Sequence, residues 1–247
     1  MTSRKNDIVD IYPEIIDEES GSRFEKLDAG PDTGHGERVP CVIGLDTSLS
    51  MNSLYKGVRL IDELNEALPI LKEVLINDEL ANETAEITVI TFGGEVQVIN
   101  KFAKVSELQF PKLIANGNTP GYEAITLGYD LLKNRINELH TQGIQVKAPI
   151  FPFFTDGGSN DPENETRAIK HIESERDRIA FFPIGTSTAD YRAMQKLEIN
   201  QPAIELFNLD FAELIAWIGK SIRTASQSRP NQKYLPPSAN CFKPMKA

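Results

Sequence analysis

Five side chains with hard oxygen atoms lie in three separate stretches of the sequence, each beside an apolar run or a glycine-rich turn. They are Asp46, Ser48 and Ser50 in "LDTSLS", Thr119 in "GNTPG" and Asp156 in "FFTDGG". Two carboxylates and three hydroxyls suit Mg²⁺, Mn²⁺ or Ca²⁺ and do not suit a zinc site of the thiolate type. If the three stretches converge in the fold, the sequence predicts a site for a divalent metal ion, with Mg²⁺ the first choice.

Each stretch also has a purely structural explanation. Ser48 or Ser50 could cap a following helix, and Thr119 is a natural N-cap before Pro120. Asp156 and the two glycines after it could form an ordinary turn. For each stretch taken singly, a cap or a turn is a simpler explanation than a metal site. Unrelated caps and turns, however, need not all fall at one edge of a sheet. The coincidence of all three stretches favours a shared site.

The elements around these stretches indicate an α/β fold. Short apolar runs predict six strands, at 39–45, 85–92, 95–100, 148–154, 179–185 and 203–209. Apolar residues at helical spacing predict helices at 57–77, 121–139, 163–177, 189–197 and 211–225. This alternation predicts a Rossmann-like, doubly wound and mostly parallel six-stranded sheet with helices on both faces. The Gly93-Gly94 link predicts a hairpin that adds one antiparallel edge strand.

In such sheets, ligands bind at the carboxyl ends of the strands, near the point where the strand order reverses. Asp46 directly follows one predicted strand, and Asp156 comes two residues after the end of another. The fold class therefore places both carboxylates where a ligand site is expected.

Composition divides the chain and limits its partners. We expect an acidic N-terminal extension at 1–38, one domain at 39–225 and a basic, proline-rich tail at 226–247. The formal net charge of -10 opposes attraction to phosphate backbones, so nucleic acid is not an expected partner. No apolar run is long enough for a membrane span or a secretion signal, and we expect a cytoplasmic protein.

The sequence "DTSLS", together with "GNTPG" and "FFTDGG", resembles the metal-ion-dependent adhesion site of von Willebrand factor type A domains. The resemblance spans residues 39–225 and is nearest to the cytoplasmic bacterial branch that includes the tellurium-resistance protein TerY. It implies that Ser48, Ser50 and Thr119 touch the metal directly, while Asp46 and Asp156 hold it largely through waters. It also implies that a Glu or Asp carboxylate of a partner protein completes the coordination. The TerY likeness further implies a role in stress response or chemical defence, where family members are often associated with a protein kinase and a PP2C-type phosphatase.

Two residues depart from that pattern. Leu49 occupies a position where the family commonly has glycine, and a leucine would be strained there if the backbone needs a positive φ. Asp161 adds an acidic group shortly after Asp156, and we expect it to be solvated. The ligand atoms themselves are all present.

Enzyme readings fit less well. A phosphoryl-transfer enzyme of the haloacid dehalogenase type needs a second carboxylate two residues after the first, and that position is Ser48. A serine hydrolase needs a nearby histidine and usually a G-x-S-x-G turn, which neither Ser48 nor Ser50 has. No P-loop or dinucleotide fingerprint follows a strand. The sequence therefore favours a metal-dependent protein-binding module over an enzyme; a metal-dependent phosphoryl-transfer hydrolase and a scaffold with a silent metal site are the alternatives.

Overall fold

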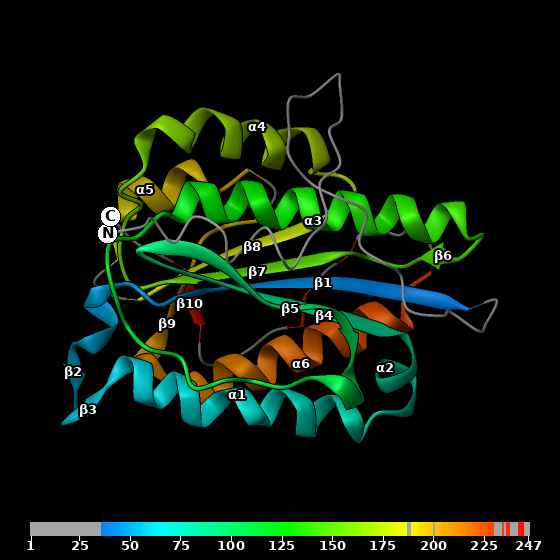
Figure 1. The fold of residues 1–247 in the computed structure, drawn as a ribbon, viewed down its shortest axis with the longest axis horizontal. Coiled ribbons are helices and arrows are strands. Elements are labelled where there is room, and N and C mark those ends of the chain that lie inside the picture. Colours follow the sequence, from blue (N-terminus) through cyan, green and yellow to red (C-terminus); the bar gives the residue numbers. More distant parts are fainter. Residues whose placement is uncertain are drawn as a thin grey trace, which may run out of the picture. The chain divides into compact units, whose positions relative to one another are not determined.

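A computed structural model describes residues 36–186, 189–199, 201–229, 234, 236–237 and 242–244 (Figure 1). The chain divides into two units, Met1–His35 and Gly36–Ala247. The extension expected at 1–38 therefore lies outside the described residues, apart from its last three. Among the described helices, none has the length and apolar character needed to cross a membrane.

A mixed, mostly parallel sheet forms the centre of the second unit. Its strands are β1 (Glu37–Asp46), β4 (Ala85–Gly93), β5 (Glu95–Lys104), β6 (Gln145–Val146), β7 (Ile150–Thr155), β8 (Ala180–Gly185), β9 (Ile204–Leu206) and β10 (Phe242–Pro244). Their order is β10-β9-β8-β7-β1-β4-β5, and β6 pairs with the start of β1. β5 pairs antiparallel with β4, as the Gly93-Gly94 link predicts. All six predicted strands are confirmed.

The sheet is larger than the sequence predicted, because it gains the short strands β6 and β10. β10 pairs antiparallel with β9 and lies in the segment that we expected to be a tail. Nearby, the Trp217 indole donates a hydrogen bond of 2.9 Å to the carbonyl of Pro237, and the rings of Trp217 and Phe242 pack edge to face. Strands of two or three residues are too short to give a detectable periodic pattern, which is why both were missed.

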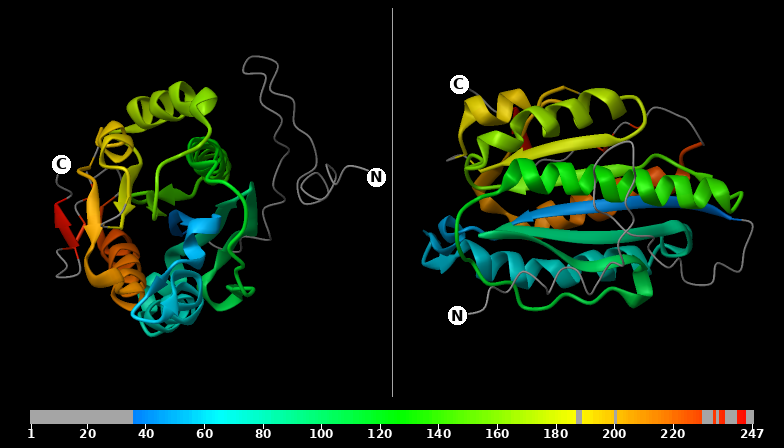
Figure 2. Two further views of the ribbon diagram at one scale, coloured as in Figure 1. Left: turned by 90° about the vertical axis from the view of Figure 1, so that its left-hand side faces the viewer. Right: turned by 45° about the horizontal axis from the view of Figure 1, so that its top comes forward.

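In the part of the chain that the structure describes, six α-helices cover the two faces of the sheet (Figures 1 and 2). They are α1 (Leu60–Ile76), α2 (Glu79–Thr84), α3 (Gly121–Thr141), α4 (Glu165–Glu175), α5 (Tyr191–Lys196) and α6 (Phe211–Gln227). α1, α2 and α6 lie on one face, and α3, α4 and α5 lie on the other. The five predicted helices are confirmed with shifted ends, and α2 was not predicted. α1 begins at Leu60 because the residues before it form a small hairpin of β2 (Leu54–Tyr55) and β3 (Val58–Arg59).

The strand order reverses at β1. From β1 the chain passes through α1 and α2 to β4 on one side, and then through α3 to β7 on the other side. Asp46 is the last residue of β1, and Asp156 directly follows β7, its parallel neighbour. Both carboxylates therefore lie at the carboxyl edge of the sheet, at the switch point where α/β folds bind ligands.

Candidate metal centre

A chain of hydrogen bonds joins four of the five predicted ligands. The Ser48 amide donates to Asp46 Oδ1 at 2.8 Å, and the hydroxyls of Ser48 and Ser50 lie 2.9 Å apart. The Ser50 hydroxyl in turn donates to Asp156 Oδ1 at 2.8 Å. The structure thus brings Asp46, Ser48, Ser50 and Asp156 together, although the last two come from loops that are 106 residues apart.

The Asp46 carboxylate is fully buried, and its second oxygen accepts a hydrogen bond of 2.6 Å from the Thr155 hydroxyl. The pKa of Asp46 is raised to about 6: burial is the largest cause, the hydrogen bonds from Ser48 and Thr155 oppose the shift, and the nearby Asp156 carboxylate adds to it. Thr155 was not among the predicted site residues. Its signal in the sequence was its place directly before Asp156 at the end of an apolar strand.

Asp156 is also largely buried, and burial raises the pKa of its carboxyl group, opposed by the hydrogen bond from Ser50. Two carboxylic acids with raised pKa values in one polar cluster indicate that negative charge is poorly compensated there. A divalent cation would supply that compensation. The pKa values therefore fit a cation-binding role for both residues.

The loop that carries Thr119, residues 116–119, is the third loop of the site. Backbone hydrogen bonds fix it against the first loop, residues 47–50, which follows β1. The Leu49 amide donates to the Gly117 carbonyl at 2.9 Å, and the Asn116 amide donates to the Thr47 carbonyl at 2.8 Å. Glycine permits this approach, because a Cβ on Gly117, where φ is +65°, would lie 2.3 Å from the Gly94 Cα. The β4–β5 turn, the first loop and the third loop therefore meet beside the site.

Thr119 is held by a residue of the Asp156 loop. Its amide donates to Asn160 Oδ1 at 2.9 Å, and its carbonyl accepts from the Asn160 amide at 2.9 Å. The residue is 7% exposed. Asn160 therefore fixes the Thr119 backbone beside the Asp156 loop, where the fifth ligand is predicted.

The capping explanations for Ser48 and Thr119 are wrong. The short 3-10 turn Leu49–Asn52 follows Ser48 without any hydrogen bond from its side chain to the turn. α3 has Pro120 as its N-cap, and neither Pro120 nor Thr119 caps it. The cap comes instead from Asp161, whose carboxylate accepts from the amides of Tyr122 at 3.2 Å and Glu123 at 2.7 Å. The hydroxyls of Ser48 and Thr119 are therefore not engaged in capping and can serve a ligand.

Asp161 itself is a correction, since we expected it to be solvated and it is 5% exposed. Sequence reasoning missed this role because the helix that it caps begins 40 positions earlier in the chain, so no local capping pattern exists. Together, Asn160 and Asp161 hold Thr119 and the first turn of α3, and we call this pair the α3 clamp. The α3 clamp ties the Thr119 loop to the Asp156 loop.

We expect Asp161→Ala to lower the free energy of unfolding by about 1–2 kcal/mol, the usual cost of losing a side-chain cap. Because the start of α3 also carries the Thr119 loop, we expect the same variant to weaken Mg²⁺ binding. Asp161→Asn keeps an acceptor oxygen and should restore most of both properties. Urea unfolding and Mg²⁺ titration of the two variants measure these effects; a destabilised Asp161→Ala with unchanged Mg²⁺ affinity would restrict Asp161 to capping.

The doubt about Leu49 is removed. Among the described non-glycine residues, only Lys56, Asn208 and Leu209 have a positive φ, so the Leu49 backbone is unstrained. Its side chain is 62% exposed beside Ser50, which is also exposed. The site is therefore buried at Asp46 and open to solvent on the side of Leu49 and Ser50.

The residues present fit a hard divalent ion. Asp46, Ser48, Ser50, Thr119 and Asp156 would hold it, and the ion would supply positive charge to the carboxylates and a coordination position for an outside oxygen. In the described part of the chain, no group of three or more His, Cys, Asp or Glu side chains could form an alternative metal site. The candidate centre thus depends on its hydroxyls as much as on its carboxylates.

No protein-family model matches the sequence, and no curated protein matches it significantly. Solved structures with a similar fold include the PilB minor pilin from Streptococcus sanguinis, with a TM-score of 0.55 and 12% identity over 83% of this chain and 64% of the pilin chain. The pilus adhesin SpaC from Lactobacillus rhamnosus GG gives a TM-score of 0.53 and 12% identity over 77% of this chain and 30% of the adhesin. Proximal thread matrix protein 1 from the mussel byssus gives a TM-score of 0.50 and 12% identity over 74% of this chain and 47% of the mussel protein.

The fold is von Willebrand A-like. The chain spans less than two thirds of the length of each of these three proteins. Identities of 12% show the fold alone, so the von Willebrand A-like architecture is established, and the metal, the partner and the pathway are matters for proposal.

Proposed function

We propose that this chain is a metal-dependent protein-protein interaction module. In this proposal, Asp46, Ser48, Ser50, Thr119 and Asp156 bind Mg²⁺, or Mn²⁺ or Ca²⁺ in its place, and a Glu or Asp carboxylate of a partner protein completes the coordination. The observation that carries the proposal is the hydrogen-bonded chain from Asp46 to Asp156 at the switch point of the sheet. Both of its terminal carboxyl groups have raised pKa values.

The charges explain why an acidic partner suits such a site. Two carboxylates balance the charge of a divalent ion. The hydroxyl ligands add no negative charge, so the ion still binds one more oxygen ligand strongly. Asp46 is buried, whereas Ser50 is exposed, so an outside group can reach the site from the Ser50 side. A carboxylate side chain supplies both the oxygen and the negative charge.

Binding fits the site better than catalysis does. Of the described histidines, His140 lies in the last turn of α3, whereas Thr119 precedes the first turn of that helix. Twenty helical residues separate these ends, or about 30 Å at 1.5 Å per residue. His171 lies on α4 with its Nε2 atom 3.6 Å from Asp130. The described hydrogen bonds of the Ser48 and Ser50 hydroxyls go to each other and to Asp156, and to neither of these histidines. The metal-dependent hydrolase and the silent scaffold remain the alternatives to be tested.

The likeness to the TerY branch extends the proposal to a setting. We propose a cytoplasmic role in a bacterial stress-response or defence system such as tellurium resistance, with a protein kinase and a PP2C-type phosphatase as candidate partners. The support for this setting is the resemblance of the sequence, with its complete set of ligand residues.

Affinity capture tests the proposal. The tagged chain serves as bait in an extract of the cells that produce it, once with Mg²⁺ and once with a chelator. We expect a partner that is retained with Mg²⁺, lost with chelator and lost with Asp46→Ala, but retained with Glu73→Ala, which removes an exposed acid on α1. Metal-dependent phosphatase turnover that disappears in Asp46→Asn would favour the hydrolase, and capture that ignores both metal and Asp46 would favour the silent scaffold.

A further inference from the structure

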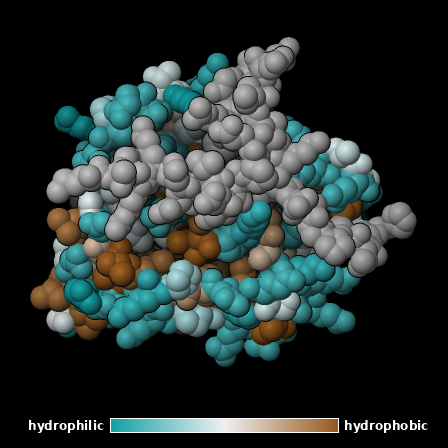
Figure 3. Space-filling view, in the orientation of Figure 1, coloured by the Kyte–Doolittle hydropathy of each residue, from teal (hydrophilic) through white to brown (hydrophobic). Residues whose placement is uncertain are grey.

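Exposed aliphatic side chains border the candidate metal centre on one side. Leu49 is 62% exposed between the two serines, and Leu54 and Val58 on the β2–β3 hairpin are 70% and 40% exposed. Figure 3 shows apolar surface at the lower left, where Figure 1 places this hairpin. The register pairs Leu54 with Arg59 and Tyr55 with Val58, so Leu54 and Val58 point to opposite faces of the hairpin. Exposed apolar side chains next to a binding site indicate contact with a partner. We call Leu49 and Leu54 the apolar rim.

Exposed carboxylates border the centre on another side. Glu95 follows Gly94, which packs against Gly117, and Glu123 lies in the first turn of α3, four residues after Thr119. Glu163 comes two residues after Asp161, whose carboxylate binds the Glu123 amide. All three side chains are exposed, and none of them forms a salt bridge with another described residue. We call Glu95, Glu123 and Glu163 the acidic rim.

The three carboxylates of the acidic rim act on one another. Although exposed, the Glu123 carboxyl is partly desolvated, which raises its pKa, and the charges of Asp161, Glu163 and Glu95 add to the rise. Negative charge therefore accumulates beside the site and disfavours the approach of a partner that carries only acidic groups.

Thr119 lies between the two rims. It has the Asn160 contact on one side and the loop that meets Leu49 on the other. The apolar rim and the acidic rim thus lie on two sides of the candidate metal centre.

We propose that the partner segment bound here combines three chemistries: a Glu or Asp that meets the metal centre, an aliphatic side chain that packs on the apolar rim, and a Lys or Arg that faces the acidic rim. This inference rests on the proposed metal-dependent binding and adds a rule for partner selection. The metal attracts the carboxylate, and the acidic rim rejects segments in which that carboxylate stands among other acids. Like charges across an interface serve specificity in this way.

Labelled synthetic peptides provide the probe, with fluorescence anisotropy as the measurement in Mg²⁺ and in chelator. The test peptide has a central Glu with two leucines on one side and Lys-Arg on the other. It is made in two versions, with the leucines either before or after the Glu in the chain. One matched peptide replaces Lys-Arg by Glu-Asp, and another replaces the central Glu by Gln. We expect Mg²⁺-dependent binding of the test peptide and about three- to tenfold weaker binding of the acidic peptide, as suits a few exposed charges.

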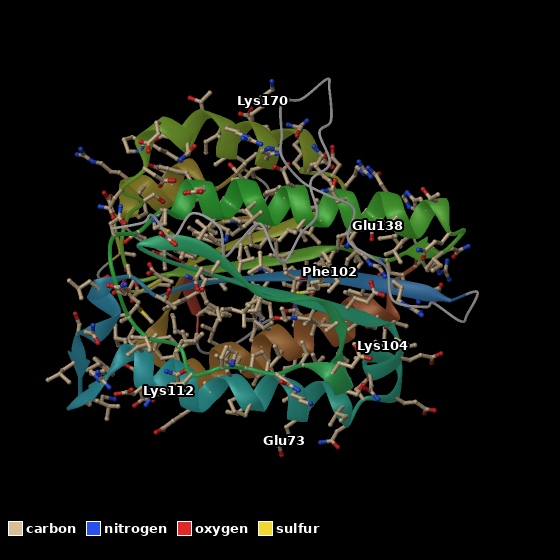
Figure 4. All side chains as sticks on the ribbon, viewed as in Figure 1. Glu73, Phe102, Lys104, Lys112, Glu138 and Lys170 are labelled. Carbon is tan, nitrogen blue, oxygen red and sulfur yellow. The ribbon has the colours of Figure 1, made fainter. Side chains whose placement is uncertain are left out.

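Protein variants assign the preference to the rims. The double variant Glu123→Lys with Glu163→Lys should reverse the preference between the basic and the acidic peptide. Leu54→Ser should weaken the binding of the two peptides about equally. All three positions are exposed, so the variants should fold. Glu73→Lys is the matched control for charge, since it alters an exposed acid about 20 Å along α1 from Leu60, and Figure 4 shows Glu73 pointing away from the body.

The outcomes separate the two proposals. Mg²⁺-dependent binding with no preference between basic and acidic peptides, or a preference that the double variant leaves unchanged, overturns the rule for partner selection and leaves the metal-dependent module in place. Binding that is absent, or equal with Mg²⁺ and chelator or with the Gln peptide, counts against the module itself and removes the inference with it.

Discussion

Mg²⁺ should raise the melting temperature of this protein by about 5–10 °C at a concentration a hundredfold above its dissociation constant. Saturation of that degree stabilises the folded state by about 2.7 kcal/mol, and each kcal/mol shifts the melting temperature of a domain of this size by about 2–4 °C. The reason lies in the site: Asp46 is fully buried, its pKa is raised to about 6, and Asp156 lies close to it. The metal compensates both charges.

The variant Asp46→Asn separates this effect from general salt effects. Asn keeps an oxygen that can accept from the Ser48 amide but carries no charge, so the variant should lose the response to Mg²⁺. Without metal at neutral pH, it should be at least as stable as the parent protein, because a buried charge has been removed. Thermal unfolding with Mg²⁺ and with chelator measures both, and Glu73→Gln is the control that should keep the full response. An Asp46→Asn variant that still responds to Mg²⁺ would refute the assignment of Asp46.

The sequence predicted the strands that build the site because they are long and apolar. β1 is buried along nearly its whole length, and β7 and β8 are buried throughout, so each reads as one continuous run. The Gly93-Gly94 link predicted the β4–β5 hairpin, because a two-residue glycine link between two apolar runs is typical of a hairpin turn. The positions of Asp46 and Asp156 then followed from the rule that parallel strands present their carboxyl ends at one edge.

The sequence could not predict how the loops are joined. The α3 clamp depends on Asn160 and Asp161 meeting residues about 40 positions earlier, and the bond from Thr155 to Asp46 spans 109 positions. Such contacts depend on tertiary packing and leave no periodic pattern in the chain. For the same reason, Thr119 resembled a helix cap until the structure showed that Asp161 fills that role.

The metal-free protein should lose stability as the pH rises from about 4 to 6. The folded state holds Asp46 with a pKa of about 6, above its ordinary value of 3.8, so folding favours the protonated acid. Its contribution is fully present below about pH 4 and is lost as the pH rises through 6. A shift of this size corresponds to about 3 kcal/mol at 1.36 kcal/mol per pH unit. The raised pKa of Asp156 acts in the same direction.

Mg²⁺ should reverse this trend, because the ion binds the carboxylate and competes with the proton, so that its stabilising effect grows over the same pH interval. Urea unfolding between pH 4 and 7, with Mg²⁺ and with chelator, measures the two opposite slopes. Comparison with Asp46→Asn isolates this residue, since the other titrating groups are common to both proteins and cancel in the difference. In chelator, the free energy of unfolding of the parent protein should fall relative to that of Asp46→Asn as the pH rises. If the difference between the two free energies does not change with pH, Asp46 titrates normally and its burial creates no demand for a cation.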